Sequence, residues 1–129
     1  MLSVKLYLPG YIKACRHKVQ MDVAAFHALS STTEKFEAVY FNNMVLVLEQ
    51  MFVHRMRGHE GKDGNPLNEV RMIANSILTN DNVLVEDSTI RYKETKSVSK
   101  LRIGGPIAIK ADSFIELANA FFKEIEQKF

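Results

Sequence analysis

The sequence predicts one α+β domain over residues 1–129, in which a long central helix and two or three further helices accompany a small antiparallel β element. Apolar residues recur at helical spacing over most of the chain, whereas strict alternation of apolar and polar residues is confined to residues 2–8. Two short apolar runs flank a Gly-Gly-Pro turn at 104–106. With 129 residues, 47% of them hydrophobic, the chain can bury one core but cannot form two full domains.

The N-terminal part of the chain is expected to contain a strand, a turn and a short helix. Residues 2–8 alternate as a half-buried strand does, and the Pro-Gly pair at 9–10 predicts a turn. Residues 11–20 fit either a second strand or an irregular return. Residues 21–29 are expected to form a helix of about two turns with Asp22 as its N-cap.

A long helix is expected from residue 32 or 33 to about residue 57. Ser31 and Glu34 match a capping box, and the chain has neither proline nor glycine from there to Gly58. The apolar residues of its second half surround the helix axis: Phe41, Met44, Val45, Leu46, Val47, Leu48, Met51, Phe52, Val53 and Met56. Because such a helix must be buried on most sides, we expect it to be the central rod of the fold and to contact a second copy of the chain.

Two more helices and a hairpin are expected in the second half of the chain. Pro66 suits the first position of a helix, with Asn65 as the N-cap. The glycines within 101–109 predict a β-hairpin, and Asp112 is expected to cap a helix that reaches the C-terminus. The polar and basic residues of 86–99 predict a partly mobile connection.

Charge and cysteine content exclude several classes of protein. The formal net charge of +2 is too small to indicate a nucleic-acid partner by itself, although residues 88–110 are locally basic. Cys15 is the single cysteine, which rules out an internal disulfide and a thiolate zinc cage and favours a reducing compartment. No apolar stretch approaches the roughly 20 residues of a membrane span, and no export signal is apparent. We therefore expect a cytoplasmic protein with no membrane partner.

The most unusual segment is the loop at 54–71, in which Gly58, Gly61 and Gly64 are spaced by three residues. Glycines free the backbone to approach a ligand closely, and the helix beginning at Asn65 directs free amides and partial positive charge toward an anion. Polar side chains of this loop are the candidate ligand-binding residues: Arg55, Arg57, His59, Glu60, Lys62, Asp63, Asn65, Asn68, Glu69 and Arg71.

A purely structural explanation of the loop is favoured over a ligand site, and both stay open. Gly58 can end the long helix, the turn at 63–65 explains a second glycine, and the charges can pair with one another. The segment matches neither a Walker loop nor a dinucleotide fingerprint nor an EF-hand. His54 and His59 lack the spacing of a helical zinc pair, so we expect no metal and no cofactor and name no catalytic residue.

Residues 60–71, which read Glu-Gly-Lys-Asp-Gly-Asn-Pro-Leu-Asn-Glu-Val-Arg, resemble a segment found in small bacterial proteins of unknown function. The resemblance covers the loop and the start of the following helix. It implies a bacterial origin and no particular activity.

The leading hypothesis is a small cytoplasmic binding or interaction protein, a homodimer, that presents the loop at 54–71 as an anion or ligand site. In the first alternative the protein is an enzyme acting on a small anionic substrate, with the loop's cations binding and His59, Glu60 or Asp63 transferring protons.

The second alternative is nucleic-acid binding by the basic N-terminal strand together with the 88–110 region. Tyr7, Tyr11 and Tyr92 would then serve as stacking groups. A nucleic-acid partner is disfavoured at this stage, because the sequence contains none of the named nucleic-acid-binding motifs.

Overall fold

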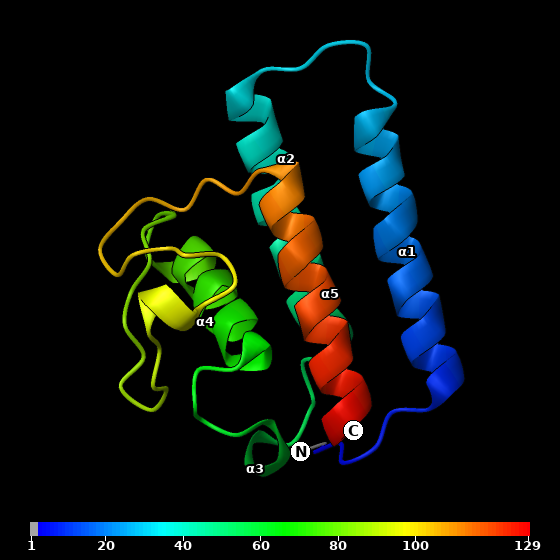
Figure 1. Ribbon diagram of the computed structural model, residues 1–129, viewed down its shortest axis with the longest axis vertical. Helices are drawn as coiled ribbons and strands as arrows, with labels where there is room; N and C mark the ends of the chain where they lie inside the picture. The colour runs from blue at the N-terminus through cyan, green and yellow to red at the C-terminus, as the bar shows by residue number, and fades with distance from the viewer. Residues whose placement is uncertain (1–2) are drawn as a thin grey trace.

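The computed structural model describes residues 3–129 as an all-helical protein (Figure 1). Its elements are α1 (Pro9–His27), α2 (Glu34–Met51), α3 (Arg57–Glu60), α4 (Pro66–Thr79), the 3-10 turn η1 (Glu94–Lys96) and α5 (Ala111–Lys128). In place of strands, these residues contain isolated bridges between Val4 and Arg55 and between Val83 and Pro106. The prediction of an α+β fold with an antiparallel β element is therefore wrong. None of the described helices is long and apolar enough to cross a membrane.

The single helix α1 replaces the predicted turn at 9–10, the undecided stretch 11–20 and the short helix, and residues 3–8 form an isolated bridge at Val4 in place of the predicted strand. Pro9 occupies the first turn of this helix, where the missing proline N–H has no intrahelical partner to lose. Residues spaced by three or four form its buried stripe: Ile12, Cys15, Val19, Val23 and Phe26. Asp22 lies inside the helix and pairs with Lys18, so it is not an N-cap. The start of the predicted strand, residues 1–2, lies outside the described residues.

A long central helix is present as α2, but it begins and ends at other residues than predicted. Thr33, and not Ser31, is its N-cap, with a side-chain oxygen that accepts a hydrogen bond from the Phe36 amide at 3.1 Å. The helix ends at Met51 because Phe52 and Arg55 turn into the protein interior, where both are buried. The apolar residues of its second half are buried or half-buried within one chain, since α1, α4 and α5 all contact the helix.

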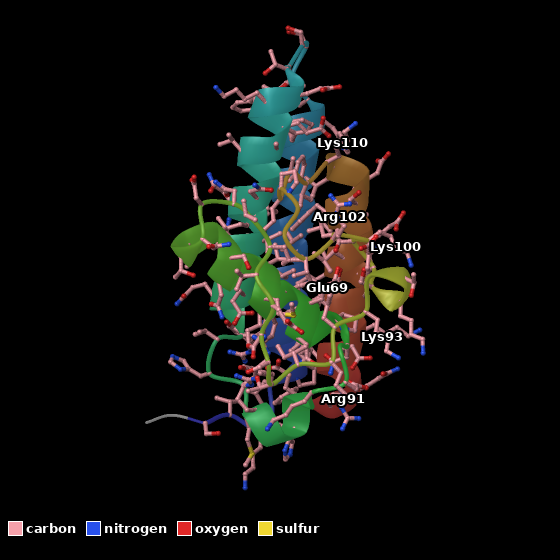
Figure 2. The ribbon with its side chains drawn as sticks, turned by 90° about the vertical axis from the view of Figure 1, so that its left-hand side faces the viewer. Glu69, Arg91, Lys93, Lys100, Arg102 and Lys110 are labelled. Atoms are coloured by element: carbon pink, nitrogen blue, oxygen red, sulfur yellow. The ribbon has the colours of Figure 1, made fainter. Side chains whose placement is uncertain are left out.

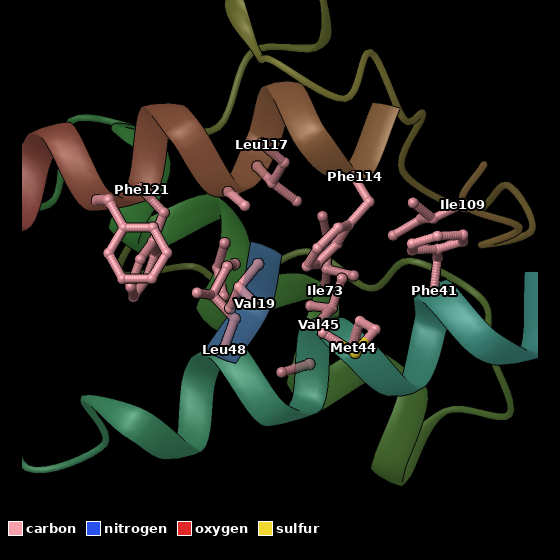
Figure 3. Packing of buried hydrophobic residues seen from close by; sticks show 14 of the residues in the cluster. Val19, Phe41, Met44, Val45, Leu48, Ile73, Ile109, Phe114, Leu117 and Phe121 are labelled. Atoms are coloured by element: carbon pink, nitrogen blue, oxygen red, sulfur yellow. The ribbon is translucent and has the colours of Figure 1, made fainter. Parts of the chain in front are cut away.

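The core lies between α2, α4 and α5, and α1 packs on the outer side of α2 and α5 (Figure 1). Figure 3 shows Leu48 of α2, Ile73 of α4 and Leu117 of α5 in the same interior, where all three are buried. Each such side chain contributes about 1.5–3 kcal/mol to folding by leaving water. This packing fixes the two helices, α2 and α4, that carry the charged loop between them.

The helix starts in the second half of the chain follow the prediction in one case out of two. Asn65 caps α4 as predicted, because its side-chain oxygen accepts hydrogen bonds from the amides of Leu67 and Asn68. Asp112 does not cap α5, which begins at Ala111. A carboxylate from α2 takes that role instead: Glu37 accepts a hydrogen bond from the Ala111 amide at 2.8 Å.

The long connection, residues 80–110, joins α4 to α5 without forming the predicted hairpin at 101–109. Side chains of the neighbouring helices hold its backbone. Asn42 of α2 donates to the Ile107 carbonyl at 2.8 Å and accepts from the Ile109 amide at 3.1 Å. Ser76 of α4 accepts from the Val85 amide at 3.0 Å. These bonds replace the strand-to-strand pairing that a hairpin would have supplied.

Candidate functional site

The loop at 54–71 folds around the carboxylate of Glu60, which has no exposed surface. Arg55 donates to it at 2.9 Å, Asn68 at 2.6 Å and Arg71 at 2.5 Å. Burial alone would raise the pKa of Glu60, but the hydrogen bond from Arg71 and the charges of Arg55 and Arg71 outweigh it and hold that pKa below its usual value. Glu60 is therefore a permanently charged anchor of the loop at neutral pH.

A second carboxylate, the partly buried Glu49 of α2, completes an ionic cluster that comprises Glu49, Arg55, Glu60 and Arg71. Arg55 donates to Glu49 at 2.9 Å, and Arg71 lies 3.8 Å from it. Burial raises the pKa of Glu49, although both arginines oppose this shift. Sequence reasoning missed Glu49 because it stands in the apolar run of the long helix. One signal for it was present in the sequence: Glu49 is a single carboxylate among ten apolar residues of a helix expected to be buried. A carboxylate in such a place needs a cation as its partner.

Arg55 ties three parts of the chain together. Besides the two carboxylates, it donates to the carbonyls of Phe52 and Leu67 at 3.0 and 3.1 Å. It therefore joins the end of α2 to the start of α4. Its guanidinium also lies 5.5 Å from the ring centre of Phe121 in α5. Four of the five N–H groups of Arg55 are thus bonded within the protein, and its side chain has no exposed surface for a ligand.

The two asparagines of the loop are equally occupied. The Asn65 amide group donates to the Glu60 carbonyl at 2.8 Å, and the Asn68 amide group donates to the Gly61 carbonyl at 2.9 Å. The Asn68 oxygen accepts from the Gly64 amide at 3.0 Å. A Cβ at Gly64 would stand 2.5 Å from the Arg91 carbonyl oxygen, and its φ of 87° is one that only glycine adopts freely. Backbone geometry thus explains this glycine without a ligand.

Gly58 does not end the long helix, as the structural explanation of the loop had it, because it lies inside α3. Glu69 points away from the ionic cluster and is buried against the long connection. Its two oxygens accept hydrogen bonds from the amides of Val98 and Ser99 at 2.9 and 2.8 Å. Six of the ten predicted ligand-binding residues therefore hold the fold together: Arg55, Glu60, Asn65, Asn68, Glu69 and Arg71.

The remaining four predicted residues, Arg57, His59, Lys62 and Asp63, are exposed. Arg57 stays 3.9 Å from Glu60, and the His59 ring lies near Phe129, with 5.8 Å between ring centres. Lys62 and Asp63 form the tip of the loop, and the Lys62 carbonyl accepts a hydrogen bond from the Arg91 amide at 2.9 Å. The structure thereby joins the tip of the loop to the long connection.

Two neighbouring hollows lie where the tip of the loop meets the long connection. Lys62, Asp63, Ser88, Thr89 and Arg91 line the first. The second shares two of these residues and is lined by Asp63, Gly64, Arg91, Lys93 and Lys96. Each hollow combines cations with one carboxylate, Asp63, whose pKa is lowered chiefly by the hydrogen bond from Asn65.

The hollows belong to a larger basic face, which consists of Lys62, Arg91, Lys93, Lys96, Lys100 and Arg102. Figure 2 shows Arg91, Lys93, Lys100 and Arg102 along one side of the molecule, with Lys110 beyond them. All six residues are exposed, and within residues 3–129 none of them forms an ion pair. The +5 charge count over residues 88–110 was the signal for this face in the sequence.

The basic residues near the N-terminus do not join this face. Lys13, Arg16 and Lys18 belong to α1, which lies on the opposite side of the α2–α5 pair from the long connection (Figure 1). Arg16 pairs with Glu126 at 2.7 Å, and Lys18 is paired within its own helix. A single interface built from both basic groups is therefore absent from this fold.

Side chains that bind metals are not gathered anywhere in the part of the chain that the structure describes. No three His, Cys, Asp or Glu residues of that part lie together as possible ligands. Comparison with known proteins adds no assignment, since no family model, curated protein or solved structure matches the chain. A function for this protein is therefore inferred from the geometry of the basic face.

Proposed function

We propose that this chain is a non-catalytic binding protein that holds an anionic ligand on its basic face. The observation that carries the proposal is the difference in pairing between interior and exposed charges. The ionic cluster neutralises itself, whereas the six cations of the basic face have no carboxylate partner within bonding distance among the described residues. Uncompensated cations around a hollow attract anions and raise their local concentration.

The first hollow offers the donors that a phosphate or carboxylate requires. Arg91 supplies a planar guanidinium, which binds two oxygens of one anion in a fixed geometry. Lys62 adds a point charge and the Ser88 hydroxyl group a further donor, whereas the Thr89 hydroxyl group already donates to Asp87 at 2.6 Å. Part of the loop at 54–71 thus remains in the proposed site, but through its exposed tip and not through its buried polar residues.

The enzyme alternative finds less support in this geometry. Glu60 is enclosed by three donors and cannot reach a substrate proton. The lowered pKa of Asp63 makes it a weak base at neutral pH, chiefly because Asn65 donates a hydrogen bond to it. A binding role needs neither residue.

Binding of inorganic pyrophosphate, followed by two-dimensional NMR of the labelled amides, tests this proposal. We expect the shifts to concentrate at Lys62 and at residues 88–96. Arg91→Gln should weaken binding about tenfold, which corresponds to about 1.4 kcal/mol, whereas the exposed Lys13→Gln on α1 should leave it unchanged. The proposal fails if millimolar pyrophosphate causes no shift, or if the two variants weaken binding equally.

We further propose that the protein is a homodimer in the cytoplasm of a bacterium, as the resemblance of residues 60–71 implies, but not through the apolar second half of α2. Since Phe41, Met44 and Leu48 of that half are buried within one chain, a second copy needs the apolar residues exposed at the end of α1 and on the first turns of α2: Leu29, Phe36 and Val39. Sedimentation equilibrium should show a dimer for the natural chain and a monomer for Val39→Glu. Leu78→Glu, at an exposed position on α4, is the control. A monomeric natural chain contradicts the dimer.

A further inference from the structure

We infer that the anion bound by the basic face is the sugar–phosphate backbone of a double-stranded nucleic acid, held without contacts to the bases. This inference rests on the proposed anion-binding function and names the ligand of the same surface. It also revises the expectation drawn from the sequence, which disfavoured nucleic acid. Three properties of the basic face support it: a fixed shape, charge without an apolar anchor, and the absence of stacking groups.

The shape of the basic face is fixed by buried hydrogen bonds. The long connection has 31 residues with one 3-10 turn, far beyond the roughly 12–15 residues that a structureless loop rarely exceeds unless it is functional. The fully buried Glu69 binds the amides of Val98 and Ser99 between the flanking lysines. Ser97 is buried as well and donates to the Glu94 carbonyl at 2.8 Å. The cations are thus presented from a preformed backbone, which lowers the ordering cost of binding.

The basic face lacks the apolar anchor of a protein-binding surface. Interfaces between proteins gain most of their energy from a few buried aromatic or aliphatic side chains and from arginine. Among residues 88–102 no large apolar side chain is exposed. The next residue, Ile103, is an exposed apolar side chain, but it stands alone. A polyanion needs no such anchor, because its affinity comes from counterions released when cations neutralise phosphates. The chemistry of this face therefore favours a nucleic acid over an acidic protein.

The absence of stacking groups favours a duplex over a single strand. Proteins that bind single strands place exposed aromatic rings against the bases. Tyr92 is half-buried, and its hydroxyl group donates to the Leu101 carbonyl and lies 3.2 Å from the Ser97 hydroxyl. Among the described residues, the exposed tyrosine and phenylalanine side chains are Tyr11 and Phe36, and the exposed histidines are His17, His27, His54 and His59; none of them belongs to the long connection. A duplex hides its bases and offers two rows of phosphates, which suits cations alone.

The cations of the basic face also lie on an irregular segment and not on a helix that could enter the major groove. Sequence is read mainly by side chains that such an element carries to the base edges. We therefore expect binding that is independent of base sequence, with a dissociation constant of roughly 10⁻⁴–10⁻⁶ M at physiological salt.

The inference is tested with two variants of the full chain that lose the same three charges on different faces. Lys93→Gln, Lys96→Gln and Arg102→Gln together remove charge from the basic face, and Lys5→Gln, Lys13→Gln and Lys18→Gln remove it near and on α1. Fluorescence anisotropy of a labelled 24-base-pair duplex, of its single strand and of polyglutamate is measured at several salt concentrations, and thermal melts verify that both variants fold.

We expect the duplex to bind more tightly than the single strand or polyglutamate. The basic-face variant should bind the duplex at least about tenfold more weakly, and its salt slope should fall by about 0.9 for each phosphate that it no longer neutralises. The α1 variant should weaken binding less than about twofold, because charges on the far side act only over a screened distance.

Other outcomes separate this inference from the proposed function. Tighter binding of the single strand or of polyglutamate overturns the duplex as ligand but leaves an anion-binding face. Equal weakening by the two variants overturns the placement of the duplex on this face. If no polyanion binds at low salt while pyrophosphate still shifts the amides of residues 88–96, the inference alone fails. If pyrophosphate has no effect either, both proposals fail.

Discussion

The ionic cluster and the basic face use the same kinds of side chain for opposite purposes. In the ionic cluster two carboxylates and two guanidinium groups are buried or partly buried and bonded to one another, so they join α2, α3 and α4. On the basic face the cations are exposed and have no acidic partner among the described residues. The comparison shows that residues 60–71, the segment with the most distinctive sequence, serve mainly to stabilise the fold. The proposed binding surface lies mostly in a segment of ordinary composition.

Glu60→Gln should have the largest effect on stability. The substitution removes the charge that Arg55 and Arg71 share and leaves the buried Arg55 and the partly buried Arg71 without this partner. We expect the free energy of unfolding to fall by about 3–5 kcal/mol, as for other broken buried ion pairs. Urea denaturation measures the change, and Glu94→Gln, at an exposed carboxylate, should shift it by less than about 0.5 kcal/mol. A loss below about 1 kcal/mol for Glu60→Gln would remove the distinction between the two regions.

Glu69→Gln should have a smaller effect that links the two regions. Glutamine can accept one of the two hydrogen bonds from Val98 and Ser99 but lacks the charge and the second acceptor oxygen. We expect a loss of about 1–3 kcal/mol in stability. Hydrogen exchange of those two amides should accelerate, and pyrophosphate affinity should fall. Unchanged exchange would mean that the shape of the basic face does not depend on Glu69.

The pH dependence of stability should reveal the ionic cluster through two opposite contributions. The folded pKa of Glu60 is lowered from 4.5, so its contribution is present above pH 4.5 and is lost as pH falls through the folded pKa. The folded pKa of Glu49 is raised from 4.5, chiefly by burial, so ionised Glu49 opposes folding. That opposition is relieved as pH falls through its raised pKa.

Urea midpoints measured between neutral and acidic pH test these signs. We expect Glu49→Gln to remove a gain in stability that the natural chain shows on mild acidification, and Glu60→Gln to remove part of its loss below pH 4.5. If both variants show the same dependence of the urea midpoint on pH as the natural chain, Glu49 and Glu60 do not contribute to stability in the way described.

The triple variant of Lys93, Lys96 and Arg102 should have the smallest effect on stability. These side chains are exposed and make no ion pair among the described residues, so their replacement by glutamine should alter the free energy of unfolding by less than about 0.5 kcal/mol. Thermal and urea unfolding provide the measurement. A loss of several kcal/mol would show that these cations support the fold and would weaken their assignment to binding.

Local patterns predicted some helix starts and misjudged others for identifiable reasons. Asn65 and Pro66 mark the start of α4 correctly, because both act within their own turn of helix. The Pro-Gly pair at 9–10 suits a turn and a helix start equally well. The apolar residues spaced by three or four from Ile12 to Phe26 favour the helix, because they form one buried face of it. Asp112 lost the capping role at α5 to Glu37, whose distance of 74 residues from Ala111 no local pattern reveals.

The candidate site was predicted in part for a similar reason. Residues 54–71 were recognised as unusual from glycine spacing and charge, yet burial decides which of their charges are free. The sequence suggested internal pairing of Glu60 with Arg57 and of Glu69 with Arg71. In the structure Arg71 binds Glu60 instead, and Glu69 accepts from the Ser99 amide, 30 residues away. The basic face needed the path of the long connection, which follows from such distant contacts.

Asn42 explains how strand-like residues can be buried in a protein without a sheet. One primary amide offers the Ile107 carbonyl a donor and the Ile109 amide an acceptor, as a residue of an adjacent strand would. Two isoleucines two residues apart can therefore enter the hydrophobic interior in extended form beside a helix. Position 42 accordingly tolerates only a side chain that both donates and accepts hydrogen bonds. Aspartate there would place a second acceptor against the Ile107 oxygen. Leucine would leave the Ile107 carbonyl and the Ile109 amide buried without a hydrogen bond.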